Sequence, residues 1–282
     1  MVTPAPYVRW RRLKLSYPSV SRNLAVEEEL ARGFSRGVRT EPTLRIWTNP
    51  KAVVVGRFQD VLAEVDLHQC EFNEVQVARR FTGGGTVFHD ESTLNLTLAS
   101  QPQESSTILR FQELNLQLVK EALDDLGLSC SRSRNSILID GRKVCGSAAA
   151  VGQHYALWHC SILVDTNTNL LNLVLAPSKS KPKPPFVHSR WQEVTTLAKA
   201  LSRPVSIDEV ASNLERMLGT KMGARLETDS LSREEERDLD SLYSDKYSSC
   251  EWNLNGNRWQ AGSSGTGETT TRQLPCASSQ RP

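Results

Sequence analysis

Hydrophobic and polar positions alternate repeatedly along the first half of the chain, and this period of two is typical of β-strands with one buried face. In STLNLTLAS, for instance, Leu94, Leu96 and Leu98 fall on one face. Two further apolar runs flank Asp140–Gly141, a dipeptide that favours the tight turn of a β-hairpin. The runs that predict strands are VRWRRLKLSY, LRIWT, AVVVGRF, VQVARRF, STLNLTLAS, NSILID and HCSILVD.

Other segments have the apolar spacing of three and four residues that predicts helices. SRNLAVEEEL has the pattern of a helix capped by Ser21 or Asn23. Residues 111–128 have the same periodicity, and Gly127 is expected to end that helix. In SIDEVASNLERML, Ser206 is the expected cap before an acidic first turn. A charged segment, SREEERDLDSLYSDKY, predicts one more helix.

These patterns divide the chain unequally. We expect one domain over residues 1–255, with a mostly helical end at 201–255. Residues 256–282 lack the apolar content needed to fold and are predicted to be a disordered tail. A basic, proline-rich loop is expected near residue 180; its lysines, Lys179, Lys181 and Lys183, favour a solvated linker over a closing or docking element.

Composition excludes some classes of protein. The 282 residues carry a formal net charge of only +2, which gives no indication of nucleic-acid or membrane binding. No apolar run approaches the roughly 18 residues that a membrane span requires. The six cysteines form no CxxC or zinc-type spacing, so we expect reduced thiols and a cytoplasmic protein. The basic start before Glu27 is compatible with a transit peptide, but its strand and helix patterns favour folded structure.

The stretch ARRFTGGGTVFHD places three glycines directly after a strand and beside two arginines. Glycines here can simply form a bulge or turn. They also remove Cβ atoms, so that backbone N–H groups can approach an anion closely. Arg79 and Arg80 lie on opposite sides of an extended strand, so only one of them can face that anion. No Lys-Ser/Thr pair follows, and the spacing is not GxGxxG, so the stretch fits neither common phosphate motif.

A second candidate lies in IDGRKVCGSAAA, where Lys143 stands between Gly141 and Gly146 and before a run of small residues. Most lysines near turns are simply exposed. A lysine next to such small residues can also contact a phosphoryl or carboxyl oxygen of a bulky ligand. Together, the arginine–glycine stretch and this lysine are more specific than either alone.

RRFTGGGTVFHD and GRKVCGSA resemble the signature segments of the lipoate–protein ligase and lipoyl/octanoyl transferase family, which is related to the biotin–protein ligases. The resemblance extends over about residues 8–255, through SRNLAVEEEL, VVVGRFQDVLAEVD, HCSILVD, HSRWQEVTTL and YSDKYSSCEWNLNG. The GRGRxG-type loop of biotin ligases is absent. The resemblance implies an α+β fold like that of class II aminoacyl-tRNA synthetases and biotin ligases, with a mainly antiparallel sheet flanked by helices.

The resemblance also implies the reaction. Lipoate and ATP, with Mg²⁺ as its counter-ion, form lipoyl-AMP and pyrophosphate, and the acyl group passes to a lysine of a lipoyl domain. The acceptors would be E2 subunits of 2-oxoacid dehydrogenases and the glycine cleavage H protein. Lys143 would be catalytic. The adenylate would be bound by Lys143 and by the arginine–glycine segment, namely Arg80, Gly83, Gly84, Gly85, Thr86, Val87 and Phe88. Leu94–Leu98 and Ile137–Ile139 are expected to line a tunnel for the lipoyl tail.

Three polar residues have less certain roles. For His89, a structural contact with Asp90 is favoured over acid–base chemistry, and His159 is expected to be a core histidine or a supporting residue. Asn135 is a weak supporting candidate, because Ser136 replaces the Asp that commonly follows it in the family. The metal ligands are therefore not predictable.

The family's C-terminal accessory domain has no counterpart in this sequence. A small partner subunit can supply it, the enzyme can accept preformed lipoyl-AMP, or the chain can be an octanoyltransferase that uses a cysteine acyl-enzyme. Among Cys130, Cys145 and Cys160, the first is the favoured nucleophile because Arg132 and Arg134 lie beside it. A non-catalytic nucleotide-binding module is the remaining alternative.

Overall fold

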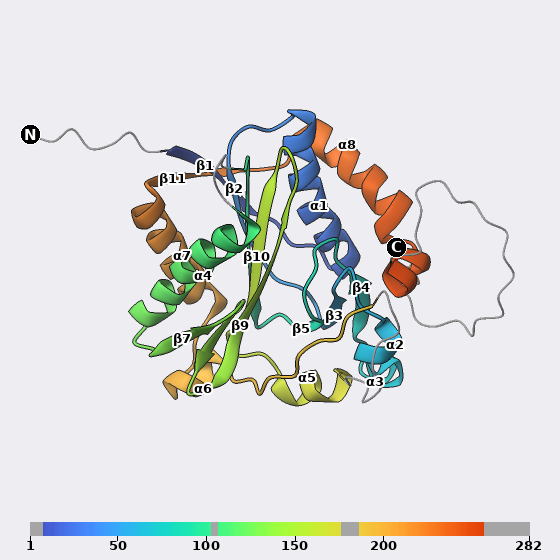
Figure 1. Cartoon of the computed structure of the whole chain (residues 1–282), viewed down its shortest axis with the longest axis vertical. Coiled ribbons are helices and arrows are strands. Elements are labelled where there is room, and N and C mark those ends of the chain that lie inside the picture. Colours follow the sequence, from blue (N-terminus) through green and yellow to red (C-terminus); the bar gives the residue numbers. More distant parts are fainter. Residues whose placement is uncertain (1–7, 103–106, 176–185, 257–282) are drawn as a thin grey trace, which may run out of the picture.

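The computed structural model describes residues 8–102, 107–175 and 186–256. Within these ranges the alternating runs form two β-sheets, and the predicted α+β class with a mainly antiparallel sheet is confirmed (Figure 1). The larger sheet has eight strands, in the order β11 (Ala224–Asp229), β1 (Val8–Lys14), β2 (Thr43–Trp47), β6 (Thr93–Ser100), β10 (Ala156–Leu163), β9 (Arg142–Val151), β8 (Ser136–Ile139) and β7 (Cys130–Ser133). β11, β1 and β2 are parallel to one another, and the remaining neighbours are antiparallel.

The smaller sheet holds the arginine–glycine stretch. Its order is β4 (Gln76–Arg79), β3 (Ala52–Val55) and β5 (Val87–His89). β3 is parallel to β4 and antiparallel to β5, so the glycine loop connects the two outer strands across the end of β3. The four residues of β3 are all buried, as expected for a central strand.

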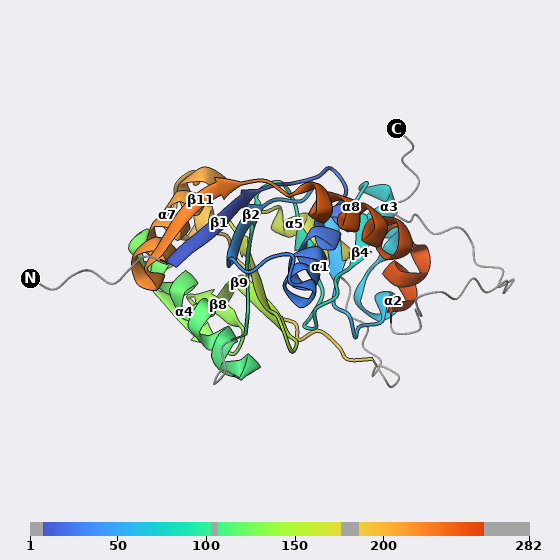
Figure 2. The ribbon, with the colours of Figure 1, turned by 90° about the horizontal axis from the view of Figure 1, so that it is seen from above.

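The helices cover both faces of the larger sheet (Figures 1 and 2). α4 and α7 pack on one face, around a core that contains Leu96, Leu116 and Leu214. α1 packs on the other face, together with α8 and Trp252. The helical segments are α1 (Val20–Arg36), α2 (Val61–Glu64), α3 (Leu67–Phe72), α4 (Ile108–Asp125), α5 (Thr168–Val174), α6 (Leu197–Leu201), α7 (Ile207–Met222), α8 (Arg233–Leu242) and two π-helical turns, η1 (Tyr243–Tyr247) and η2 (Glu251–Asn255).

Local signals account for several boundaries. Asp140 and Gly141 have φ of 49° and 75°, and they form the predicted hairpin turn between β8 and β9. Ser206 caps α7 as predicted, by accepting a hydrogen bond from the backbone of Glu209. The predicted cap of α1 was wrong, because Ser19 fills that role.

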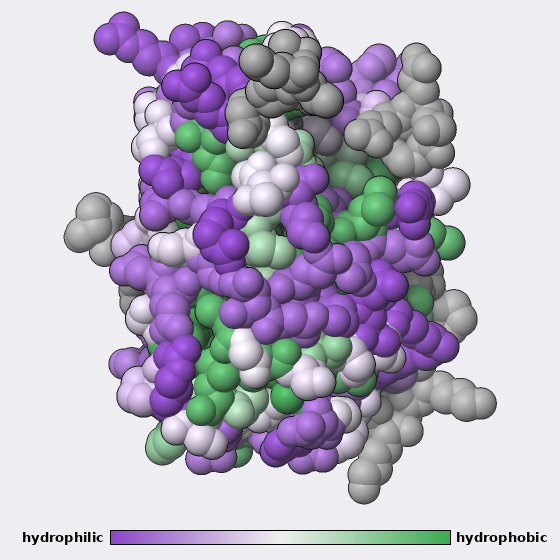
Figure 3. Space-filling model, turned by 90° about the vertical axis from the view of Figure 1, so that its left-hand side faces the viewer, coloured by the Kyte–Doolittle hydropathy of each residue, from purple (hydrophilic) through white to green (hydrophobic). Residues whose placement is uncertain are grey.

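The face that carries β1, β11, α4 and α7 is mainly hydrophilic, with smaller hydrophobic patches between the polar side chains (Figure 3). No helix among the described residues is both long enough and apolar enough to cross a membrane. The basic loop with Lys179, Lys181 and Lys183 and the predicted tail lie outside the described residues, apart from Gly256. Most of residues 201–255 is helical, and β11 adds the parallel edge strand of the larger sheet.

Candidate active site

The glycine loop packs so tightly against its surroundings that side chains are excluded at two positions. Gly84 has a φ of 92°, which favours glycine, and a Cβ there would lie 2.9 Å from an Arg80 nitrogen. At Gly56, which follows β3, a Cβ would lie 2.1 Å from the carbonyl oxygen of Gly84. The absence of a side chain at Gly56 and Gly84 is therefore needed for the packing of the loop against β3 and Arg80.

Arg79 and Arg80 point in opposite directions, as the alternation predicts. The Arg80 guanidinium lies beneath the loop and donates to the carbonyl oxygens of Gly83 (2.7 Å), Gly85 (2.7 Å) and Val54 (3.1 Å). Burial lowers the pKa of Arg80 to about 10, so it remains a cation at neutral pH. Arg80 thus fixes the loop's conformation and places positive charge under it.

A cavity of about 450 Å³ opens between the glycine loop and the larger sheet. Arg80, Gly84, Gly85, Thr86, Val87, His89, Asn135, Lys143 and His159 all line it. A second cavity of about 110 Å³ shares residues with it, among them Thr86, Val87, Lys143 and Gly146, and is also lined by Phe88. Gly83 lines neither cavity, and its carbonyl oxygen faces Arg80. The structure therefore brings together all but one of the predicted site residues.

Lys143 lies where the two cavities meet. Its backbone is fixed on both sides, by hydrogen bonds to Glu193 (2.8 Å) and Thr195 (3.0 Å). Its side chain passes so close to Gly146 that a Cβ there would lie 2.8 Å from both Cε and Nζ. Within the described ranges the ammonium has no hydrogen bond or ion pair. Burial lowers the pKa of Lys143, and the charge of Arg80 acts in the same direction.

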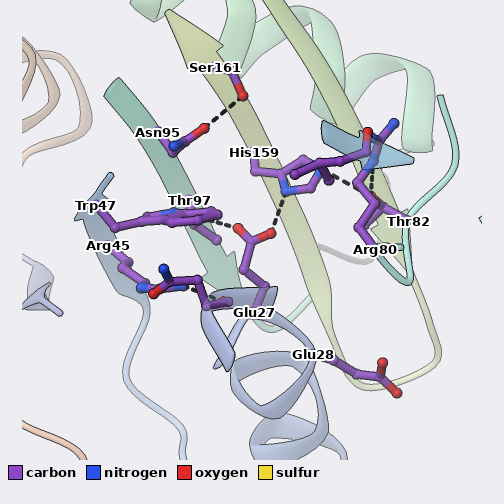
Figure 4. Close-up of polar contacts among 12 residues, drawn as sticks. Glu27, Glu28, Arg45, Trp47, Arg80, Thr82, Asn95, Thr97, His159 and Ser161 are labelled. Atoms are coloured by element: carbon purple, nitrogen blue, oxygen red, sulfur yellow. Dashed lines mark hydrogen bonds and ion pairs between the residues drawn. The ribbon is translucent and has the colours of Figure 1, made fainter. Parts of the chain in front are cut away.

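A chain of hydrogen bonds connects the floor of the cavity to the glycine loop (Figure 4). Arg80 Nε donates to Thr82 Oγ1 (3.1 Å), which lies 3.0 Å from His159 Nε2. Thr82 Oγ1 is thus hydrogen-bonded to both Arg80 and His159, and His159 Nδ1–H donates to Glu27 (2.8 Å). Thr97 donates to the other Glu27 oxygen. His159 is therefore a largely buried histidine with two partners, and it supports the loop through Thr82.

The sequence interpretation assigned no role to Glu27, although its carboxylate ends this chain of hydrogen bonds. Burial alone would raise its pKa, but the charge and hydrogen bond of His159, the charge of Arg45 and the hydroxyl of Thr97 outweigh burial and lower it. Glu27 is therefore a buried carboxylate at neutral pH. Its signal in the sequence is its place on the inner face of α1, where an apolar residue is expected.

His89 is a neutral structural residue. Burial, followed by the charge of Arg80, lowers its pKa to about 3. Asn49 Nδ2 donates to Nδ1 (2.9 Å), so Nε2–H donates to Ser161 (2.8 Å). The predicted contact with Asp90 was wrong, because Asp90 accepts instead from the backbone of Asn167 (2.8 Å) and from residues of its own turn.

The segment of residues 186–195 closes one side of the cavity, and no role was predicted for its residues. Ser189 Oγ accepts from Thr86 N (2.9 Å) and from Gln59 Nε2 (2.8 Å). Gln59 Oε1 accepts in turn from the Thr86 hydroxyl (2.8 Å). Glu64 holds the segment from the other side, by accepting from Ser189 N (2.9 Å). Only the resemblance of HSRWQEVTTL to the family could have indicated this part of the site.

The apolar lining differs from the predicted tunnel. Leu94–Leu98 and Ile137–Ile139 supply their apolar side chains mainly to the packed core between the sheet and α4, and only Asn95 of these segments lines a cavity. The period of two shows which residues share a face but not which face is covered by a helix. The apolar residues that do line the cavities are Leu24, Trp47, Val54, Val87, Phe88, Ala148, Leu163, Leu171, Leu175, Val187, Trp191 and Val194, besides Cys145 and Cys160.

Cys130 is not the best-placed thiol. It lies in the core, and burial raises its pKa to about 12. Cys145 lines the second cavity and Cys160 the first, where burial raises the pKa of Cys160 well above its usual range. These three and Cys70 are free thiols.

No predicted metal ligand gains support from the geometry. Among the described residues, no group of three or more His, Cys, Asp or Glu side chains could hold a metal ion. Asn135 is exposed, and its amide donates to the carbonyl oxygen of Ser147 (2.9 Å). Mg²⁺ usually binds through substrate phosphates and waters, so a dedicated protein site is not needed for it.

A cationic glycine loop and a half-buried lysine face one cavity, and this arrangement favours an anionic ligand. The model of the lipoyl protein ligase A/B catalytic domain matches residues 19–219, and the chain belongs to this family. It is 30% identical to lipoate-protein ligase A subunit 1 of Thermoplasma acidophilum, over 86% of this chain and 96% of that protein. It is also 30% identical to octanoyltransferase LipM of Symbiobacterium thermophilum, over 87% and 98%.

Solved structures agree with this assignment. A bi-partite lipoate protein ligase of T. acidophilum superposes with a TM-score of 0.79 at 29% identity, covering 90% of this chain and 99% of that one. A lipoate-protein ligase A bound with ATP superposes with a TM-score of 0.78 at 28% identity, covering 88% and 99%.

Proposed function

We propose that the protein is a lipoate–protein ligase that converts lipoate and ATP to lipoyl-AMP and pyrophosphate, and then transfers the lipoyl group to a lysine of a lipoyl domain. The observation that carries this proposal is the meeting of the cationic glycine loop and the Lys143 ammonium in one cavity. Both half-reactions need positive charge at the acyl–phosphate junction, and these groups supply it.

In the first half-reaction, a lipoate carboxylate oxygen attacks the α-phosphorus of ATP, and the bond to pyrophosphate breaks. Two anions approach each other, so cationic groups must offset their repulsion. Lys143 would contact the carboxylate and the α-phosphate, and Arg80 would add charge beneath the loop. Because Lys143 has no partner among the described residues, no protein contact has to be broken before it binds substrate.

In the second half-reaction, the ε-amine of the acceptor lysine attacks the acyl carbonyl carbon, and AMP leaves with the electron pair of the broken C–O bond. Negative charge develops on the carbonyl oxygen and on the AMP phosphate, and Lys143 would stabilise both. The apolar residues of the cavities would bind the lipoyl tail. Mg²⁺ would accompany the nucleotide through its phosphates.

The relatives support each substrate. One solved structure of the T. acidophilum protein, at 28% identity and a TM-score of 0.76, contains lipoic acid, and a second relative contains ATP. The structure at 29% identity is described as part of an archaeal lipoylation system, comprising a bi-partite lipoate protein ligase and its E2 lipoyl domain, and the sequence relative is called subunit 1. We therefore propose a lipoyl domain as acceptor and a separate small subunit as partner in adenylation.

A second function, transfer of octanoyl from a carrier protein, is favoured by two observations. LipM proteins match over 87% of this chain, at 28–30% identity. Cys145 and Cys160 also line the cavities, so that a thiol could form an acyl-enzyme there. For Cys160, burial holds the pKa well above the usual range, which disfavours its thiolate.

The test is the modification of a recombinant lipoyl domain, followed by intact mass. Three parallel reactions would contain lipoate with ATP and Mg²⁺, synthetic lipoyl-AMP, or octanoyl carrier protein. Product from the first identifies a complete ligase, and product from lipoyl-AMP alone identifies a chain that needs a partner for adenylation. Product from the octanoyl carrier alone contradicts the proposal, and a chain that is inactive in all three but binds ATP is a nucleotide-binding module.

A further inference from the structure

Arg79 is a fully buried cation that no carboxylate within the described ranges pairs with. Its guanidinium donates to backbone carbonyl oxygens of two separate segments. One pair of acceptors belongs to the turn after β3, at Gly56 (2.9 Å) and Gln59 (2.7 Å). The other pair belongs to η2, at Trp252 (3.1 Å) and Leu254 (3.0 Å). A buried guanidinium needs its acceptors, so movement of one segment leaves the charge poorly satisfied.

The backbone of Arg79 is held by the same π-helical turn, which lies beside β4 (Figures 1 and 2). Arg79 N donates to Asn253 Oδ1 (3.0 Å), and Trp252 Nε1 donates to the Arg79 carbonyl oxygen (2.9 Å). Gly256 ends η2 with a φ of 57°, and a Cβ there would lie 2.6 Å from Arg79 Nε. The carboxyl end of η2 thus encloses Arg79 on its backbone and on its side chain.

The other contacts of Arg79 reach the glycine loop. The Gln59 side chain accepts from Gly56 N (3.2 Å) and from the Thr86 hydroxyl (2.8 Å). Gly56 in turn packs against the Gly84 carbonyl oxygen so closely that no Cβ fits between them. A shift of Arg79 is therefore expected to displace the turn of Gly56–Gln59, and with it the loop at Gly84 and Thr86.

We propose that η2 is a positioning element of the active site, in which Trp252, Asn253 and Gly256 set the glycine loop through Arg79. None of these four residues lines the cavity, so their effect is indirect. The kinetic consequence rests on the proposed adenylation reaction, whereas the effect on loop conformation does not. The experiment therefore measures both.

Two glycines provide a matched pair. Gly256 and Gly223 have φ of 57° and 60°, so Gly256→Ala and Gly223→Ala introduce similar backbone strain. An added Cβ at Gly256 meets Arg79 at 2.6 Å, whereas at Gly223 it meets nothing within 4 Å. We expect Gly256→Ala to lower kcat/KM for ATP in adenylation about tenfold, and to speed amide exchange in residues 83–86. Gly223→Ala should lower Tm and leave both quantities unchanged.

Two tryptophans provide a second, milder pair. Trp252→Phe keeps a ring at the position but removes the hydrogen bond to Arg79, and should lower kcat/KM about fivefold. Trp158→Phe also changes a buried tryptophan, but its indole N–H has no hydrogen-bond partner among the described residues, so it serves as the control.

Equal kinetics and equal loop exchange within each pair would overturn the inference, because a merely structural role predicts loss of Tm alone. If the wild type proves inactive with every acyl donor, the proposed function fails. Amide exchange of residues 83–86 then still decides the inference: faster exchange in Gly256→Ala than in Gly223→Ala supports it, and equal exchange rejects it.

Discussion

Gly146→Ala is expected to lower activity without lowering stability, because the added methyl group disturbs only the flexible end of the Lys143 side chain. A Cβ at Gly146 would lie 2.8 Å from Lys143 Cε and Nζ, and apart from its two chain neighbours no other described residue has an atom within 4 Å of it. Gly146 is in β9 and its φ is not positive, so alanine fits the backbone. Replacing glycine at such a position usually stabilises a protein by about 0.4–1 kcal/mol.

The same contact should move the Lys143 ammonium. Non-bonded carbon atoms are comfortable at about 3.5–4.0 Å, so the end of the side chain must shift by about 1 Å. A misplacement of this size can lower a rate about 10²-fold, or about 2.7 kcal/mol of transition-state stabilisation. Complete removal of a preorganised donor costs about 10²–10³-fold, which bounds the effect from above.

The assay measures pyrophosphate release and lipoyl-domain mass for Gly146→Ala, Lys143→Met and the double variant, with Tm for each. We expect the glycine variant to keep or raise Tm while losing most activity, and the double variant to be no slower than Lys143→Met. Wild-type turnover in Gly146→Ala would refute the placement of the Lys143 ammonium at the reacting atoms. A further tenfold loss in the double variant would show that alanine acts on something other than Lys143.

Other predictions concern buried ionisable groups. Because burial lowers the pKa of Lys143, adenylation should lose activity at a lower pH than an exposed lysine would allow, and Lys143→Arg should remove this alkaline limb in a pH–rate profile. Burial raises the pKa of Glu29 to about 7 despite its pairing with Arg36. The contribution of Glu29 to the free energy of unfolding is therefore fully present below the unfolded pKa of about 4.3, and it is lost as the pH rises through 7. Glu29→Gln should therefore leave urea unfolding unchanged at pH 4 and add on the order of 1 kcal/mol at pH 8, after allowance for solvent screening. Cys145→Ser and Cys160→Ser should leave ATP-dependent lipoylation within about twofold of wild type, and loss of activity in either would favour the acyl-enzyme route.

The sequence was sufficient for features that depend on local signals. The Asp140–Gly141 turn, the Ser206 cap and the opposite orientation of Arg79 and Arg80 follow from neighbouring residues alone. Nearly every residue that the family resemblance indicated lines one of the two cavities. Both kinds of prediction depend on short segments whose residues are neighbours in the sequence, and such residues stay close together in the fold.

Features that depend on distant segments were not predictable. Glu27 reaches His159 and Ser189 reaches Thr86 across more than a hundred residues, and no pattern in one sequence reports such pairs. The same reason explains the misplaced tunnel. The face that Leu94–Leu98 presents is covered by α4, and this covering is a tertiary fact that alternation does not contain.

The role of Arg80 shows how the proposed anion site of the loop follows from packing. Arg80 pulls the carbonyl oxygen of Gly83 inward, and in a planar trans peptide the N–H of Gly84 must then point the opposite way. The N–H groups of Gly83, Gly84 and Gly85 have no acceptor within the described ranges. Arg80 therefore contributes its own positive charge and also orients the backbone donors above it. For this reason a guanidinium, which can hold several carbonyl oxygens at fixed angles, suits the position better than a lysine would.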